Sequence, residues 1–163
     1  METPDTVQAL MIMLAGIQTI YYYHLMPPIV ASHFNAAGAP NGWSAKSSIF
    51  ILYWIVIGVA VLVAQAIPVL TGALPPSMVN LPKKDYWMTD ENWPRAKAML
   101  KTYSKWFGAI LLFFLLIVFE LVFRINLTHD PVLGNYFWMV LVLFFVLVIG
   151  WSIRFVTRFL QTD

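Results

Sequence analysis

Residues 48–70 read SIFILYWIVIGVAVLVAQAIPVL, and Gln65 is the only strongly polar side chain among them. About 20 helical residues cross a hydrocarbon layer of roughly 30 Å, so this run predicts a transmembrane helix. Its single proline, Pro68, lies close to the end of the run. This stretch decides the class of the fold, and the rest of the chain is interpreted outward from it.

Three further apolar runs have a similar length, and they cover about residues 7–26, 106–126 and 136–155. Aromatic residues, which favour the headgroup layer, cluster at the end of the first run and at the start of the last. We therefore predict an all-α membrane protein whose single domain, residues 1–163, is a bundle of four transmembrane helices.

The composition supports this class and excludes others. Apolar residues make up 60% of the chain and charged residues 11%, with a mean hydropathy of +0.73, whereas a soluble domain needs more polar surface. A net charge of +2 is too small to indicate nucleic-acid binding. There is no cysteine for a disulfide or thiolate site, and no sequence motif of a known enzyme class. We expect neither an enzyme nor a resident cofactor.

The basic residues are distributed unevenly between the segments that connect the runs. Eight of the ten lie between the second and third runs or at the C-terminal end, and they are Lys83, Lys84, Arg95, Lys97, Lys101, Lys105, Arg154 and Arg158. The other two are Lys46 and Arg124. The positive-inside rule then predicts that both termini lie in the cytoplasm and that residues 24–46 lie outside.

Residues 91–105, before the third run, combine an apolar helical face with a stripe formed by Lys97, Lys101 and Lys105. This pattern is typical of an amphipathic helix that lies near the headgroups with its lysines toward anionic lipid. We predict such a helix on the cytoplasmic side, leading into the third span. A docking face for a cytoplasmic partner is the alternative.

The segment between the first two runs, residues 24–46, reads HLMPPIVASHFNAAGAPNGWSAK. Residues 30–34 favour a strand, and Pro40-Asn41-Gly42 fits a β-turn with proline at its second position. We expect an ordered loop that folds over the outer end of the bundle.

Two motifs resemble the signatures of a known family. The first comprises Leu25-Met26-Pro27, residues 29–35 and residues 38–43, followed by Lys46, and the second is NLPKKDYW at 80–87. Together they are similar to a bacterial membrane-protein family of unknown function that is related to the immunity proteins against the sporulation-delaying toxin. The resemblance implies a multi-pass protein of the bacterial cytoplasmic membrane whose outer loop recognises a peptide, a toxin or an envelope component.

Two hypotheses concern the chemistry of the outer loop. Ligand or partner binding would use His33, Phe34, Asn35, Asn41 and Trp43, although His33 and Asn35 could instead hydrogen-bond the backbone of the loop. A zinc site is the second hypothesis. Its nitrogen and oxygen ligands would be His24, His33, His129, Glu120 and Asp130.

Glu120 and Arg124 lie within the third run, where a charged side chain is costly and indicates a functional site by default. Their i, i+4 spacing also favours a structural ion pair on one helix face. The sequence thus predicts a small multi-pass membrane protein that acts as a binding, sensing or immunity-type module through residues 24–46. The alternative is a structural or accessory subunit that packs against other membrane-protein subunits.

Overall fold

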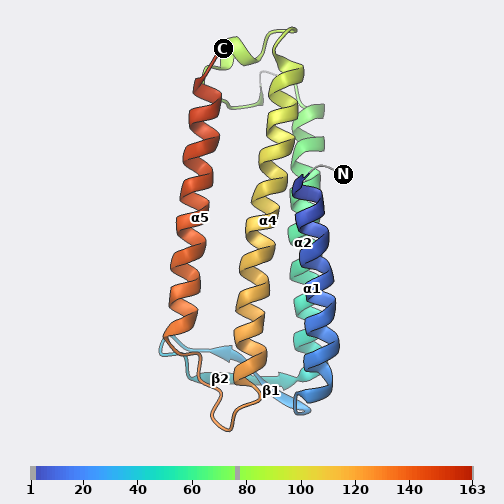
Figure 1. Ribbon diagram of the computed structural model, residues 1–163, viewed down its shortest axis with the longest axis vertical. Coiled ribbons are helices and arrows are strands. Elements are labelled where there is room, and N and C mark those ends of the chain that lie inside the picture. The colour runs from blue at the N-terminus through green and yellow to red at the C-terminus, as the bar shows by residue number, and fades with distance from the viewer. Residues whose placement is uncertain (1–2, 76–77, 163) are drawn as a thin grey trace.

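The computed structural model describes residues 3–75 and 78–162. Its elements follow the order α1 (Thr3–Leu25), β1 (Ile29–Phe34), β2 (Pro40–Ala45), α2 (Lys46–Ala73), α3 (Lys84–Trp87), α4 (Trp93–Ile125) and α5 (Asn135–Leu160). The long helices run side by side, with the β-hairpin across one end and α3 near the other (Figure 1). The fold is therefore mostly helical, but it is not all-α, because residues 29–45 form a two-stranded sheet.

Within the described residues, three helices are long and apolar enough to cross a membrane: α2, α4 and α5. The first predicted run also forms a helix, α1, but Gln8, Gln18 and the tyrosines at 21–23 make it less apolar. The structure thus supports a membrane protein with three candidate spans, and a fourth span stays a prediction.

The segments predicted as an interfacial helix and as the third span form one continuous helix, α4, of 33 residues. Proline is tolerated in the first turn of a helix, which explains why Pro94 does not interrupt it. At 1.5 Å per residue α4 is about 50 Å long, more than a hydrocarbon layer of roughly 30 Å requires.

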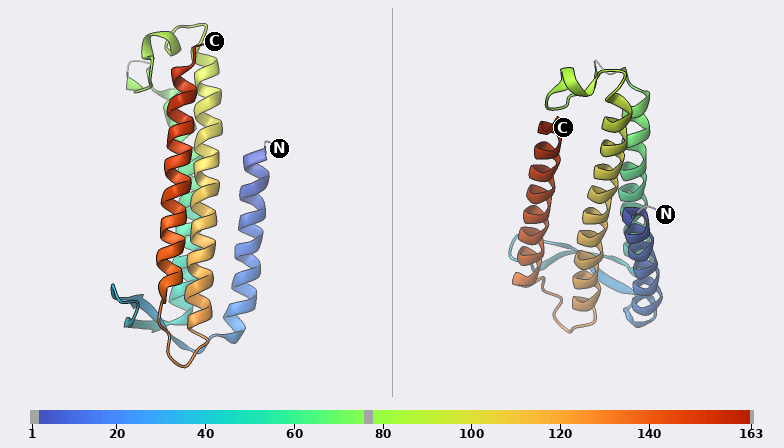
Figure 2. Two further views of the ribbon diagram at one scale, coloured as in Figure 1. Left: turned by 60° about the vertical axis from the view of Figure 1, so that its left-hand side comes forward. Right: turned by 45° about the horizontal axis from the view of Figure 1, so that its top comes forward.

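Helices α1, α2 and α4 pack together, whereas α5 lies mainly against α4 and is separated from α1 (Figure 2). The main core lies between α1, α2 and α4, and it includes Ala15, Tyr22, Tyr53, Ile57, Leu112 and Phe123. Gly108 permits a close approach of α4 to α2, because a Cβ there would lie 2.4 Å from the Cβ of Ala64. Small residues at such a crossing are typical of membrane helix pairs.

A second core cluster closes the end opposite the hairpin. Trp87 of α3 is fully buried, packs on Phe159 of α5, and donates a hydrogen bond from its indole N–H to the Phe159 carbonyl at 2.8 Å. The cluster also contains Val79, Leu81 and Ala96. The segment between α2 and α4 therefore holds the C-terminal end of α5 against the N-terminal part of α4.

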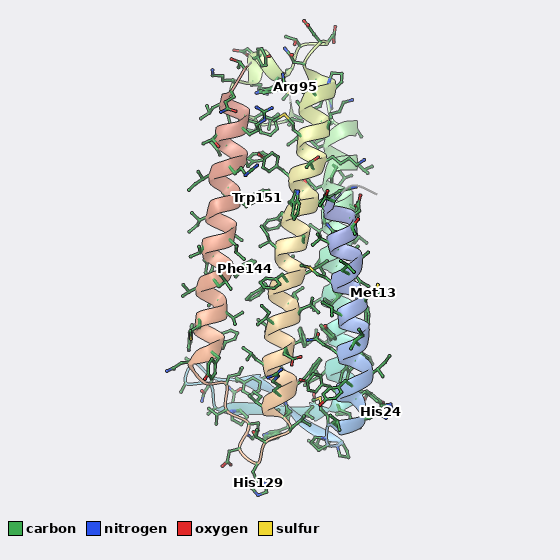
Figure 3. The ribbon with its side chains drawn as sticks, in the orientation of Figure 1. Met13, His24, Arg95, His129, Phe144 and Trp151 are labelled. Atoms are coloured by element: carbon green, nitrogen blue, oxygen red, sulfur yellow. The ribbon has the colours of Figure 1, made fainter. Side chains whose placement is uncertain are left out.

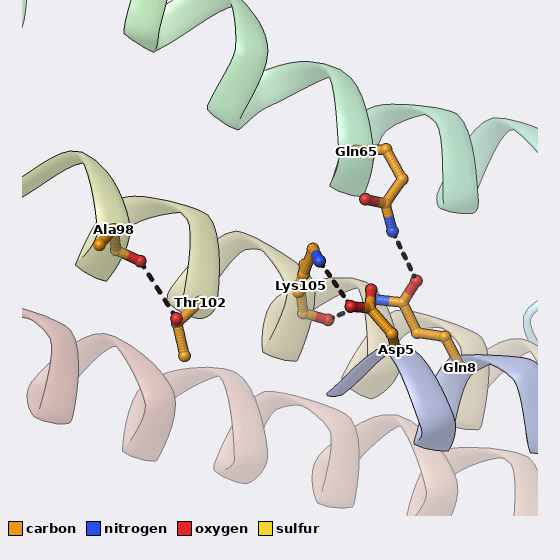
Figure 4. Close-up of polar contacts among 6 residues, drawn as sticks. All are labelled: Asp5, Gln8, Gln65, Ala98, Thr102 and Lys105. Atoms are coloured by element: carbon orange, nitrogen blue, oxygen red, sulfur yellow. Dashed lines mark hydrogen bonds and ion pairs between the residues drawn. The ribbon is translucent and has the colours of Figure 1, made fainter. Parts of the chain in front are cut away.

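Lys105 departs from the predicted lysine stripe. It is only 6% exposed, and its Nζ lies 2.6 Å from Asp5 Oδ2 at the start of α1 (Figure 4). Beside it, the Gln8 amide donates to the Lys105 carbonyl at 2.6 Å, and Gln65 donates to Gln8 at 3.3 Å. Helix α1 begins at this level of α4, so Lys105 faces a helix rather than the headgroups.

Candidate functional site

The hairpin that replaces the predicted loop has an irregular antiparallel register. Ala31 pairs with Trp43 and His33 with Gly42, which leaves Ser32 as an extra residue on β1. Phe34 then pairs with Pro40, which leaves Asn41 as an extra residue on β2. Bulges of this kind bend a strand and redirect its side chains, and they often occur next to functional sites.

The turn of the hairpin lies at residues 35–39 and not at the predicted Pro40-Asn41-Gly42, which belongs to β2. Asn35 Oδ1 accepts hydrogen bonds from the N–H groups of Ala37 at 2.9 Å and Ala39 at 3.0 Å. An asparagine that bonds the backbone ahead of it is a strong turn former, and it decides the position here. The structural alternative that the sequence left open for Asn35 is thus the arrangement observed.

Asn126, at the end of α4, fastens β1 to the bundle. Its amide accepts from the Ala31 N–H at 2.7 Å and donates to the Ala31 carbonyl at 3.0 Å, as a neighbouring strand would. It also donates to the Val122 carbonyl in the last turn of α4 at 2.9 Å. Asn126 is 5% exposed and Ala31 is fully buried, so these bonds are shielded from water.

Two further contacts hold the hairpin in place. The Leu133 N–H donates to the Gly38 carbonyl at 2.8 Å, which ties the turn to the link between α4 and α5. Lys46 Nζ donates to the carbonyls of Tyr23 at 2.8 Å and Met26 at 3.1 Å, beside the end of α1. Gly38 has φ +79°, a left-handed conformation that glycine adopts at little cost.

A groove of about 450 Å³ lies between the hairpin and helices α2, α4 and α5. The hairpin contributes Ser32, His33, Phe34, Asn35, Ala36 and Gly38; the helices and the link contribute Ile49, Leu52, Val118, Phe119, Val122, Leu133, Phe137 and Trp138. Its wall is mostly apolar, and its polar groups come from the hairpin. Apart from the histidine, none of these lining residues, all in the described part of the chain, is ionisable.

The predicted ligand residues separate into two groups. His33, Phe34 and Asn35 line the groove. Asn41 and Trp43 are exposed on β2 and do not line it. The His33 ring lies against Gly42, where a Cβ would come within 3.1 Å of Nδ1, and Ser32 Oγ lies 3.2 Å from the same nitrogen.

The predicted pair of Glu120 and Arg124 is part of a larger polar network that lies deeper in the bundle. Arg124 Nε lies 2.6 Å from Glu120 Oε1, and the Tyr22 hydroxyl donates to the same oxygen at 2.7 Å. Gln18 donates to Oε2 at 2.8 Å and accepts from the Tyr53 hydroxyl at 2.5 Å. Glu120 thus links α4 to α1 with both of its oxygens engaged, and Gln18 extends the network to Tyr53 of α2.

The structure does not bring the five predicted zinc ligands together. Among the described residues, no group of three or more His, Cys, Asp or Glu side chains could hold a metal ion. His24 lies at the end of α1 and His129 at the tip of the α4–α5 link (Figure 3). Glu120 is already bound by Gln18, Tyr22 and Arg124. The zinc hypothesis, which also needs His33 and Asp130, is therefore not supported.

Sequence reasoning missed Asn126 and the helix residues that complete the groove. Asn126 directly follows α4, at the same end of the bundle as the hairpin, and an asparagine at that position was the available signal. Phe137 and Trp138 were predicted only as interface aromatics. Their role in the groove depends on the position of α5, which no local pattern reveals.

Taken together, these features define a small helical protein with membrane-length helices and a hairpin that covers one end. Residues 10–58 match the sequence model of a family described as a domain of unknown function, DUF1648. The match extends from α1 through the hairpin into α2, less than half of the chain. Neither the curated proteins nor the solved structures yield a match.

Proposed function

We propose that this chain is a four-span membrane protein whose hairpin groove binds an apolar segment of a peptide at the outer surface. The observation that carries the proposal is the groove itself. It combines an apolar wall from α2, α4 and α5 with polar groups on one rim from the hairpin. Ligand sites typically have this composition and a volume of roughly 300–1,000 Å³.

The surface of α1 supports its assignment as the fourth span. Its side away from α2 and α4 presents large apolar side chains that are each more than half exposed: Leu10, Met13, Leu14, Ile17 and Ile20. Continuous apolar surface of this kind is costly in water and favourable in lipid. Helix α1 also lies alongside α2 and α4, so a bilayer that contains those helices surrounds α1 as well (Figure 1).

The charge distribution supports the placement of the hairpin outside. The eight basic residues identified above lie toward the end that carries α3 and the C-terminus, whereas Lys46 and Arg124 lie toward the hairpin. The positive-inside rule assigns the basic end to the cytoplasm. Because the chain lacks cysteine, a single Asn41→Cys or Lys83→Cys can be labelled uniquely. An impermeant maleimide is expected to label intact cells through Asn41→Cys only, and the reverse pattern contradicts the orientation.

The dimensions and chemistry of the groove favour a peptide over a charged small molecule. A volume of about 450 Å³ accommodates one or two large apolar side chains, and among the described residues no Lys, Arg, Asp or Glu lines it for a charged ligand. Ser32 and His33 on the rim can hydrogen-bond a peptide backbone. A peptide toxin is also the ligand that the resemblance to the immunity proteins implies. The role is binding without catalysis, because the nearby Glu120 is fully engaged by its neighbours.

Photo-crosslinking in native membranes tests the proposal. Benzoylphenylalanine at Val118, on the groove wall, is expected to capture a peptide, whereas the same residue at Val142, 62% exposed on α5, captures lipid or nothing. Ala36→Trp, which places bulk at the rim, should abolish the peptide adduct. Asn41→Ala, outside the groove, should leave it unchanged.

Two results contradict groove binding. One is an identical set of adducts from positions 118 and 142. The other is a peptide adduct at position 118 that survives Ala36→Trp in a protein that folds and inserts normally.

A second candidate function is an accessory subunit of a larger membrane complex, and α5 is the observation that favours it. No residue in the apolar window of α5 is buried, and among the described helices it packs mainly against α4. Its exposed side could pack against another subunit. Co-purification in mild detergent at native abundance tests this role, and a chain that remains alone argues against it.

A further inference from the structure

A cleft of about 480 Å³ lies between α4 and α5 at the end opposite the hairpin. Arg95 of α4 and Arg154 and Arg158 of α5 line it, together with the hydroxyl side chains of Thr102, Tyr103 and Thr157. No carboxylate is among its lining residues in the described chain. The cleft therefore concentrates positive charge without an acidic side chain in its wall.

The two helices bring these arginines to one place. Arg154 and Arg158 are one turn apart, so they lie on the same face of α5. Arg158 Nη1 donates to the Gln161 side chain at 3.1 Å, and the Arg95 guanidinium lies 5.7 Å from the Trp87 ring centroid. These contacts orient the guanidinium groups of Arg158 and Arg95, and guanidinium groups suit the oxygens of a phosphate in size and geometry.

An apolar groove of about 600 Å³ continues from the cleft along the α4–α5 seam toward the hairpin. It shares Thr102, Tyr103 and Arg154 with the cleft and is otherwise lined by Trp106, Ile110, Val146, Leu147, Gly150 and Trp151. Trp151 extends from α5 toward α4 and donates to the Tyr103 carbonyl at 3.1 Å (Figure 3). Gly150 leaves space, since a Cβ there would meet no atom within 4 Å.

We propose that this seam binds an anionic phospholipid, with the phosphate at the three arginines and an acyl chain in the apolar groove. The arginines lie near the helix ends, where a lipid headgroup would be, and the apolar groove runs toward the middle of the bundle, where an acyl chain would be. Basic pockets between helices on the cytoplasmic side are typical sites for anionic headgroups. A free phosphate fits the cleft equally well but makes no use of the groove.

Native mass spectrometry of the full chain, with equimolar phosphatidylglycerol and phosphatidylcholine of matched acyl chains, tests this site. We expect preferential retention of phosphatidylglycerol. Arg154→Gln with Arg158→Gln should lower that retention by about tenfold or more, because charge-assisted hydrogen bonds are lost. The matched control, Lys83→Gln with Lys97→Gln, removes two charges from the same end outside the cleft and should retain the preference.

Gly150→Leu tests the acyl-chain groove and should weaken retention of the lipid while leaving the arginines intact. Inorganic phosphate and glycerol phosphate serve as chain-free probes, and neither should displace the lipid at equal concentration. Equal losses in the arginine and lysine variants overturn the proposal. So does phosphate binding that Gly150→Leu leaves unchanged while the lipid fails to bind.

Discussion

The substitution Asn126→Ala tests how the hairpin is fastened to the bundle. It removes the two hydrogen bonds to Ala31, which is fully buried, and one bond to the Val122 carbonyl. Each bond contributes about 1 kcal/mol, and a buried backbone group without a partner costs roughly 1–3 kcal/mol. Since water enters in part once the side chain is cut back, we expect a total loss of about 2–4 kcal/mol.

The loss should be concentrated in the hairpin. Hydrogen exchange over residues 29–45 should accelerate by about 100-fold, which corresponds to roughly 3 kcal/mol of local opening, while α2 and α4 change little. Asn126→Asp retains an acceptor for the Ala31 N–H, but it places a buried carboxylate against the carbonyl oxygens of Ala31 and Val122, so its effect should be at least as large.

The control is Asn41→Ala, which removes an exposed side chain from the same hairpin. It should alter exchange and stability by less than about 0.5 kcal/mol. Equal exchange rates in the Asn126→Ala and Asn41→Ala proteins would refute the argument that one buried amide secures β1.

Three further predictions concern single positions elsewhere. Gly38→Ala should detach the turn from the α4–α5 link, because its φ is +79° and a Cβ would lie 2.0 Å from a backbone oxygen, whereas Gly134→Ala should be tolerated; proteolysis of the hairpin measures both. Gly108→Ala should destabilise the α2–α4 crossing by about 1–3 kcal/mol in a detergent unfolding assay, and Ala64→Gly should restore part of that loss. The ion pair with Lys105 lowers the pKa of Asp5, which precedes the first predicted span. The stability that this pair contributes is complete above about pH 4 and declines as the pH falls further. The Asp5→Asn protein lacks the pair, so acid should weaken the packing of α1 less in this variant than in the parent protein.

The long helices could be predicted because their signals are local. Each reflects a run of apolar residues whose partition into lipid depends on its own composition and length. The ion pair of Glu120 and Arg124 was likewise accessible, because i, i+4 neighbours on a helix meet whatever surrounds them. Errors at this level came from competition between nearby signals: Asn35 determined the turn, although Pro40-Asn41-Gly42 carried the more familiar pattern.

The partners of the polar side chains could not be predicted in the same way. Lys105 fitted a lysine stripe by its spacing, yet it pairs with Asp5, 100 positions away in the sequence. Glu120 was paired correctly with Arg124, but Gln18 and Tyr22 come from α1, which only the packing of the bundle places beside it.

By itself, the sequence determined that this is a membrane-type helical protein, where its long helices lie, and which end is basic. Only the tertiary structure decided that residues 29–45 form a hairpin, that Asn126 fastens this hairpin to the bundle, and that a groove lies beneath it. The same holds for the cleft at the other end, where arginines of α4 and α5 lie beside a second, apolar groove. The physical reason is range. Lipid partition and helix periodicity depend on neighbours within a few turns, whereas these sites depend on contacts such as that of Ala31 with Asn126, 95 residues apart, which exist only when the helices pack in one arrangement.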